Sequence, residues 1–152
     1  IAILHHQLYQ HEDLHTIELN TFVEELLRQI SIVFKKQGQD VMINNLIPKT
    51  FFDIDVALPL GLILNELATN TFKYAHPSVN NEQIQKLLIE IKLMKDRDDI
   101  YTLVYKDNGS GLSKTFDLDK AKSLGLRIVT RLSKQLKGTC EYEYEEGAKF
   151  SI

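Results

Sequence analysis

Three polar residues, Glu66, Asn70 and Lys73, are spaced so that they share one face of a helix. At 100° per residue, positions i, i+4 and i+7 fall within about 60° of one another. An amide oxygen is a hard ligand that suits Mg²⁺, and an ammonium group supplies a point charge to phosphate. The pattern fits a magnesium–polyphosphate site, but an ordinary amphipathic helix also carries a polar face at this spacing.

Two glycine-bearing segments follow this helix in the chain. The first runs from Asp107 to Gly111, where Gly109 and Gly111 permit close approach of the backbone and Asp107 can present an acceptor to a pocket. The second places Gly125 at the start of a helix, where free backbone N–H groups bind phosphate. Each segment alone is also ordinary turn or helix-start chemistry, so the argument depends on their order and separation.

The elements that must position these residues alternate between helices and pairs of strands. Because this order is not a strict strand–helix alternation, it predicts an α/β fold, a two-layer sandwich with a mixed, mostly antiparallel sheet and helices on one face. The periodicity predicts the end of a helix at 1–10, a polar connection at 11–19, helices at 21–36, 58–75 and 126–136, and strands at 41–46, 51–54, 87–95, 100–106, 139–145 and 148–152. Thr21 and Glu24 have the spacing of a capping box, and Pro59 is expected in the first turn of its helix.

Composition excludes several classes of protein. The chain has 152 residues, a formal net charge of −3 and one cysteine, Cys140. A general nucleic-acid binder would be basic, and a secreted disulfide scaffold needs paired cysteines. Because a single cysteine fits a reducing cytosol, we expect a cytoplasmic location. The longest uncharged apolar run is too short to cross a bilayer, and membrane attachment of a parent protein is left open. Because the chain does not begin with Met, we expect it to be a fragment of a longer protein.

Taken together, the segments Glu66–Tyr74, Asp107–Gly111 and Leu124–Leu126 resemble the N-box and the two glycine boxes of the GHKL ATPases, and most closely the ATP-binding catalytic domain of sensor histidine kinases. Leu58-Pro-Leu-Gly-Leu-Ile-Leu-Asn-Glu-Leu resembles the HWE-related subgroup. Residues 3–17 resemble the junction between the second dimerisation helix and the catalytic domain. The resemblance therefore divides the chain into a junction at 1–18 and a catalytic domain at 19–152.

The resemblance implies a role for each matching residue. Asp107 would accept a hydrogen bond from the adenine amino group, Asn70 would hold Mg²⁺, and Glu66 would act near the metal as the catalytic residue. Lys73 would meet a phosphate. A further set would contact the nucleotide: Tyr74, Gly109, Gly111, Leu124, Gly125 and Leu126.

The sequence departs from the family pattern near its end. The family often has Gly-Thr-x-Phe where this chain has Gly147-Ala148-Lys149-Phe150. A threonine hydroxyl that helps the adenine-binding carboxylate is thereby lost, which predicts weaker ATP binding by about 0.5–1.5 kcal/mol. Thr71, where many kinases have Ala, is interpreted as a minor change.

The resemblance implies a histidine protein kinase fragment that binds Mg-ATP and donates the γ-phosphoryl group to a histidine outside the chain. Its partners would be the dimerisation and phosphoacceptor domain of the same parent and a response regulator in two-component signalling. We expect the fragment to be monomeric and the parent dimeric. Two alternatives stay open: a GHKL ATPase or serine kinase of the anti-sigma type, and a degenerate nucleotide-binding module.

Overall fold

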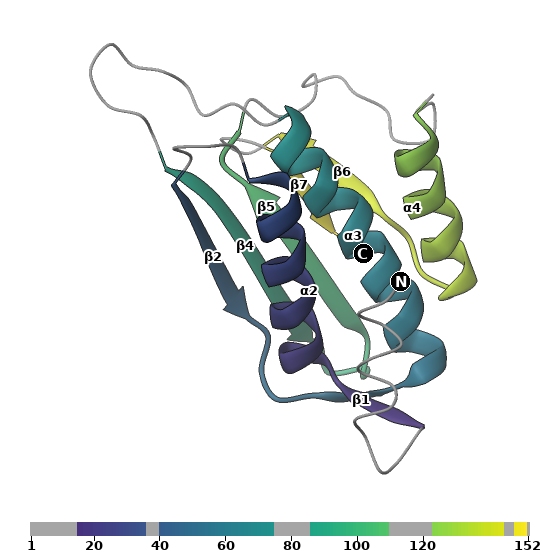
Figure 1. The fold of residues 1–152 in the computed structure, drawn as a ribbon. Coiled ribbons are helices and arrows are strands. Elements are labelled where there is room, and N and C mark those ends of the chain that lie inside the picture. The colour runs from purple at the N-terminus through teal and green to yellow at the C-terminus, as the bar shows by residue number, and fades with distance from the viewer. Residues whose placement is uncertain (1–14, 36–39, 75–85, 110–122, 145–147, 152) are drawn as a thin grey trace.

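Within the residues that the structure describes, three helices cover one face of a five-stranded sheet in the computed structural model (Figure 1). The structure describes residues 15–35, 40–74, 86–109, 123–144 and 148–151. The strand order is β2-β4-β5-β7-β6; β2 pairs with β4 in parallel, and the other neighbours are antiparallel. This confirms the predicted two-layer sandwich with a mixed, mostly antiparallel sheet. The strands of this sheet are β2 (Val41–Leu46), β4 (Leu87–Lys95), β5 (Tyr101–Asp107), β6 (Glu141–Tyr144) and β7 (Ala148–Ser151).

The helices are α2 (Leu19–Phe34), α3 (Ile54–Tyr74) and α4 (Leu124–Gln135). The central helix α3 packs against both α2 and α4 (Figure 1). The side chains of β4 alternate between buried and exposed along most of the strand, which is the pattern of a sheet with one face on the core. Buried side chains from α2, α3 and the inner face of the sheet form a single core.

A short strand that the sequence analysis missed precedes α2. The residues expected to be a polar connection include β1 (Thr16–Glu18), which pairs antiparallel with β3 (Phe51–Asp53). A three-residue strand has too little periodicity to be recognised, and its partner is more than thirty residues away in the chain. Ile17, at its centre, is 1% exposed and joins the core.

The start of α2 differs from the predicted capping box. The N-cap is Glu18, whose carboxylate accepts hydrogen bonds from the backbone N–H of Thr21, at 2.8 Å, and from its hydroxyl. Thr21 therefore lies inside the helix, not at its cap. Burial alone would raise the pKa of Glu18, but the hydrogen bonds from Thr21 and from the backbone of Asn20 and Thr50 together outweigh burial, and the pKa is lowered.

The start of α3 also lies earlier than predicted, at Ile54 and not at Leu58. Pro59 is thus in the second turn, where the missing N–H removes the helical hydrogen bond to the carbonyl of Asp55. At the start of the helix, the side chain of Asp53 accepts a hydrogen bond from the backbone N–H of Asp55 at 3.3 Å. The tertiary packing of partly buried Ile54 against the core overrides the sequence signal.

The remaining predicted elements are confirmed to within two residues at each end. The helix expected at 1–10 lies outside the described residues. Within the described part of the chain, no helix combines the length and the apolar character that a membrane span requires.

Candidate functional site

Three chain segments that carry the predicted chemistry end or begin at the same end of the molecule. The C-terminal end of α3, the end of β5 and the start of α4 all lie at the top of Figure 1. They are far apart in sequence, and the fold brings them together because α3 and α4 are neighbours over the sheet that contains β5.

The carboxylate of Glu66 and the amide of Asn70 both approach the first turn of α4. A Cβ atom placed on Gly125 would lie 2.7 Å from Oε2 of Glu66 and 3.9 Å from Nδ2 of Asn70. Real Cβ atoms essentially never approach another atom within 3.0 Å, so Gly125 permits the close packing of α4 on these two side chains. The structure thus brings together one predicted catalytic residue, one predicted metal ligand and one predicted nucleotide-binding glycine.

The donor set at this point fits a magnesium ion. Glu66 and Asn70 are one helical turn apart, and both are half-buried. Their carboxylate and amide oxygens are the hard ligands that Mg²⁺ prefers, and Mg²⁺ usually completes its shell with waters and phosphate oxygens. Within the described residues no group of three or more His, Cys, Asp or Glu side chains is placed to hold a metal ion.

Asp107, the last residue of β5, is held by hydrogen bonds on both carboxylate oxygens. The backbone N–H of Gly109 donates to Oδ1 at 3.0 Å, and the hydroxyl of Thr71 on α3 donates to Oδ2 at 2.7 Å. Asp107 is only 5% exposed. A buried carboxylate with donors on both oxygens is fixed in orientation.

The phenol of Tyr105 extends this network below Asp107. Its oxygen lies 2.6 Å from Oγ1 of Thr71, and the Tyr105 side chain is fully buried. Burial, and secondarily the negative charge of Asp107, raise the pKa of Tyr105 well above its usual value, while the hydrogen bond with Thr71 opposes this. The phenol therefore stays protonated and acts as a neutral hydrogen-bonding group.

Asn108 fastens the residue after β5 to the neighbouring strand. Its side-chain oxygen accepts from the N–H of Leu88 at 2.7 Å, and its amide donates to the carbonyl of Lys86 at 2.8 Å. The backbone N–H of Asn108 also donates to the carbonyl of Leu88, at 3.2 Å. These bonds hold the chain that leaves Asp107 against the start of β4.

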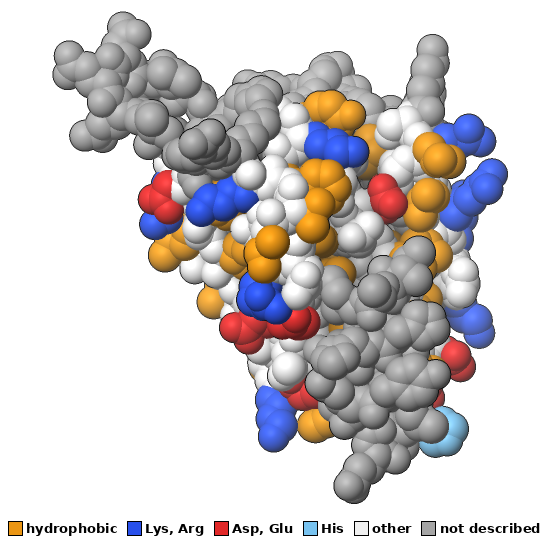
Figure 2. Space-filling model, viewed as in Figure 1, with side chains coloured by type: hydrophobic (Ala, Val, Ile, Leu, Met, Phe, Trp, Pro, Cys, Tyr) orange, Lys and Arg blue, Asp and Glu red, His pale blue; other side chains and the backbone are white. Residues whose placement is uncertain are grey.

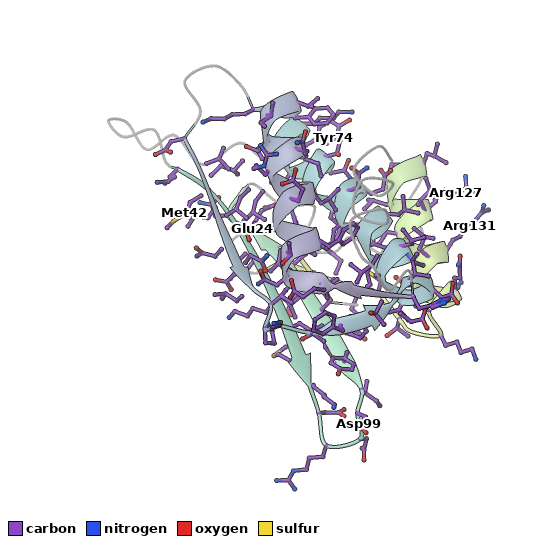
Figure 3. All side chains as sticks on the ribbon, turned by 60° about the horizontal axis from the view of Figure 1, so that its bottom comes forward. Glu24, Met42, Tyr74, Asp99, Arg127 and Arg131 are labelled. Atoms are coloured by element: carbon purple, nitrogen blue, oxygen red, sulfur yellow. The ribbon has the colours of Figure 1, made fainter. Side chains whose placement is uncertain are left out.

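Lys73 and Tyr74 lie apart from this cluster. The ammonium group of Lys73 is 5.4 Å from the ring centroid of Phe34 on α2, a cation–π contact on the side of α3 away from α4. Tyr74 is 68% exposed at the end of α3 (Figure 3). Their assignment to phosphate and to the nucleotide pocket stays a prediction.

The other predicted nucleotide-binding residues differ in their surroundings. Leu126 is 7% exposed and belongs to the core, whereas Leu124 is 72% exposed. Gly109 is buried beside Asp107, and Gly111 lies outside the described residues.

The basic side chains of α4 face away from the site. Lys and Arg side chains gather along the edge of the molecule that α4 forms (Figure 2). Arg127 and Arg131 are exposed and point outward from the helix, away from α3 (Figure 3). Their position favours a solvated face over contact with the predicted site.

Thr71, Tyr105 and Asn108 were missed as site residues by the sequence analysis. A signal was present for two of them. Thr71 lies seven positions after buried Leu64, so it falls on the buried face of α3, and a polar residue there requires a partner. Tyr105 and Asp107 are two apart on one strand, so their side chains share a face of the sheet.

The fold and this constellation define the class of protein: a two-layer sandwich of the GHKL ATPase type. The family model described as "Histidine kinase-, DNA gyrase B-, and HSP90-like ATPase" matches residues 55–152. The chain belongs to this ATPase family. No curated protein matches the chain by sequence.

Solved structures of histidine kinases have the same fold. The histidine kinase domain of the Erythrobacter litoralis EL346 blue-light activated histidine kinase is 16% identical, with a TM-score of 0.75, covering 98% of this chain and 67% of that one. A second structure of that kinase is 18% identical, with a TM-score of 0.78 over 99% of this chain. This chain covers 49%, about half, of the length of that second structure. The mycobacterial sensor histidine kinase MprB is 16% identical, with a TM-score of 0.63, covering 91% of this chain and 95% of that one.

Proposed function

We propose that this chain binds Mg-ATP as the catalytic domain of a sensor histidine kinase and donates the γ-phosphoryl group to a histidine outside the chain. The observation that carries the proposal is the convergence of Glu66 and Asn70 on the start of α4, at the same end of the fold as Asp107. One cluster offers hard oxygen ligands beside a helix N-terminus, and the other offers a fixed acceptor. This division suits a nucleotide with a charged tail and a base that donates hydrogen bonds.

Each residue has a separate task in this proposal. Asp107 accepts a hydrogen bond from the exocyclic amino group of adenine and repels the carbonyl that guanine has at the same position. The amide of Asn70 holds Mg²⁺, which when bound neutralises charge on the phosphates. Glu66 orients the attacking nucleophile, and the first turn of α4 offers backbone N–H groups to phosphate oxygens. Catalysis of phosphoryl transfer consists mostly of such positioning and charge stabilisation.

The sequence supports a finer assignment within the histidine kinases. The segments Leu58–Leu67 and Ser123–Arg127 resemble the HWE-related subgroup. We propose accordingly that residues 1–18 form the junction with a dimerisation domain and that residues 19–152 form the catalytic domain. The partners would be the phosphoacceptor helices of the same parent protein and a response regulator.

Incubation with γ-labelled ATP and Mg²⁺ tests this function. The chain alone is expected to bind ATP without becoming labelled, whereas the parent protein is expected to acquire a label that acid removes and alkali does not. Rapid release of phosphate by the chain alone would indicate an ATPase, and an acid-stable label on serine would indicate a serine kinase. Absence of binding at millimolar Mg-ATP would leave a degenerate module as the better description.

A further inference from the structure

We propose that Thr71 and Tyr105 set the base selectivity of the nucleotide site by holding Asp107 as a hydrogen-bond acceptor. The inference rests on the proposed function, in which Asp107 meets the base. It assigns a positioning role to two buried residues that need not touch the nucleotide.

All three side chains of this network are buried. Thr71 is 3% exposed, Tyr105 is 0% exposed and Asp107 is 5% exposed. Buried polar groups without partners are costly, so three of them in one chain of short contacts indicate a connected network. The two contacts are 2.6 Å between Tyr105 and Thr71 and 2.7 Å between Thr71 and Asp107.

The direction of each hydrogen bond in this network follows from the number of hydroxyl protons available. The Thr71 hydroxyl has one proton and three oxygen neighbours, the third being the carbonyl of Leu67 at 3.1 Å. Within the described residues the phenol of Tyr105 has no other hydrogen-bond partner, so it donates to Thr71. The Thr71 proton is then directed to the shorter, charge-assisted contact with the carboxylate of Asp107. The chain of donation runs from Tyr105 to Thr71 to Asp107.

These hydrogen bonds determine which bases the carboxylate of Asp107 can pair with. Oδ2 receives the Thr71 proton and Oδ1 receives the N–H of Gly109. The carboxylate cannot rotate without breaking one of these bonds, and each of its oxygens accepts one of them. A base that presents an amino group can donate to it, whereas a base that presents a carbonyl places two acceptors together.

A single turn of α3 carries one residue for each half of the site, the metal-binding half and the base-binding half. Asn70 faces α4, and the next residue, Thr71, faces β5, because consecutive residues on a helix point about 100° apart. The register between β5 and β7 pairs Lys106 with Lys149, so continuing it by one residue places the backbone of Ala148 opposite Asp107. The supporting hydroxyl therefore comes from Thr71, on the helix above the sheet. The sequence predicts that the neighbouring strand provides none, because Ala148 has no hydroxyl group.

Affinities for three nucleotides test the proposal: ATP, with a 6-amino group; ITP, with a 6-carbonyl; and purine riboside triphosphate, with neither. In Thr71→Val, which keeps the size of the side chain, the ratio of ATP to ITP affinity is expected to fall about tenfold, since a hydrogen bond to a charged group is lost. The affinity for purine riboside triphosphate should change much less. Thr71→Ser keeps the hydroxyl and should preserve the ratio.

Tyr105→Phe provides a second measurement if Thr71→Val does not fold. Without the phenol, the Thr71 hydroxyl is free to turn toward the carbonyl of Leu67, so the ratio of ATP to ITP affinity should fall, by less than in Thr71→Val. Equal losses for all three nucleotides, or an unchanged ratio in the folded variants, would overturn the proposal and leave the proposed function intact. A wild-type chain that binds none of the three would refute the proposed function and this inference with it.

Discussion

Replacement of Gly125 by alanine tests whether the start of α4 packs directly on the carboxylate of Glu66. The new Cβ would lie 2.7 Å from Oε2, and ordinary contact begins at 3.4 Å, so the two groups must separate by about 0.7 Å. Because Oε2 is the far end of a flexible, half-buried side chain, Glu66 can yield by leaving its rotamer at a cost of about 0.5–1.5 kcal/mol, whereas a Gly→Ala change within a helix by itself stabilises by about 0.5–1 kcal/mol. We therefore expect a small net change in the free energy of unfolding, between a gain of about 0.5 kcal/mol and a loss of about 1 kcal/mol.

A double-mutant cycle measured by thermal or denaturant unfolding isolates this contact. In the Glu66→Ala background the carboxylate is absent, so Gly125→Ala should be stabilising, and the two effects should be non-additive by about 0.5–1.5 kcal/mol. Gly138→Ala is a matched control, because its Cβ would meet only the carbonyl of Ser133 at 3.6 Å, an ordinary contact. Additive effects of Gly125→Ala and Glu66→Ala would refute the packing on which the site is built.

Three further predictions concern the surroundings of the site and the frame of the fold. Asn108→Ala removes two side-chain hydrogen bonds to the backbone of Lys86 and Leu88, at the start of β4, and should lower the free energy of unfolding by about 1–3 kcal/mol in a denaturant titration. It should also weaken ATP binding measured by calorimetry, and unchanged stability together with unchanged ATP affinity would contradict the role of Asn108 as a clamp. The pKa of Glu18 is lowered in the folded state, so the ionised carboxylate stabilises the fold above about pH 4.5, and this stabilisation is lost as the pH falls through the lowered pKa. Glu18→Gln should therefore flatten the acid limb of a curve of unfolding free energy against pH, and an unchanged curve would contradict this role of Glu18. Burial raises the pKa of Cys140 to about 11, so alkylation of the folded protein should be slow at pH 8 and accelerate toward pH 11, with fast reaction at pH 8 arguing against burial of the thiol.

Much of the fold was predictable because the signals that specify it are local. The alternation of buried and exposed residues in β4 and the apolar stripe of α2 are both visible in the sequence. The boundaries that were wrong depend on distant partners. β1 exists because it pairs with β3, and α3 starts at Ile54 because that side chain packs on the core.

The same distinction applies to the site. The helical spacing of Glu66 and Asn70 predicts a shared face, and the structure adds the distance to Gly125 that spacing alone does not contain. The role of Thr71 could not be predicted from local sequence, because its hydroxyl meets Asp107, thirty-six positions later in the chain. A threonine that reads as a minor change in one motif becomes a partner of another once the fold is known.

Calorimetric titration of ATP into the wild-type chain and into Asp107→Asn, each with Mg²⁺ and with EDTA, tests whether Asp107 and a divalent cation hold ATP in this site. We predict saturable binding by the wild type that weakens without Mg²⁺, and a loss of about tenfold or more in Asp107→Asn, because one acceptor facing the adenine amino group becomes a donor. No heat of binding at millimolar Mg-ATP, or equal affinity of the two proteins, would contradict it.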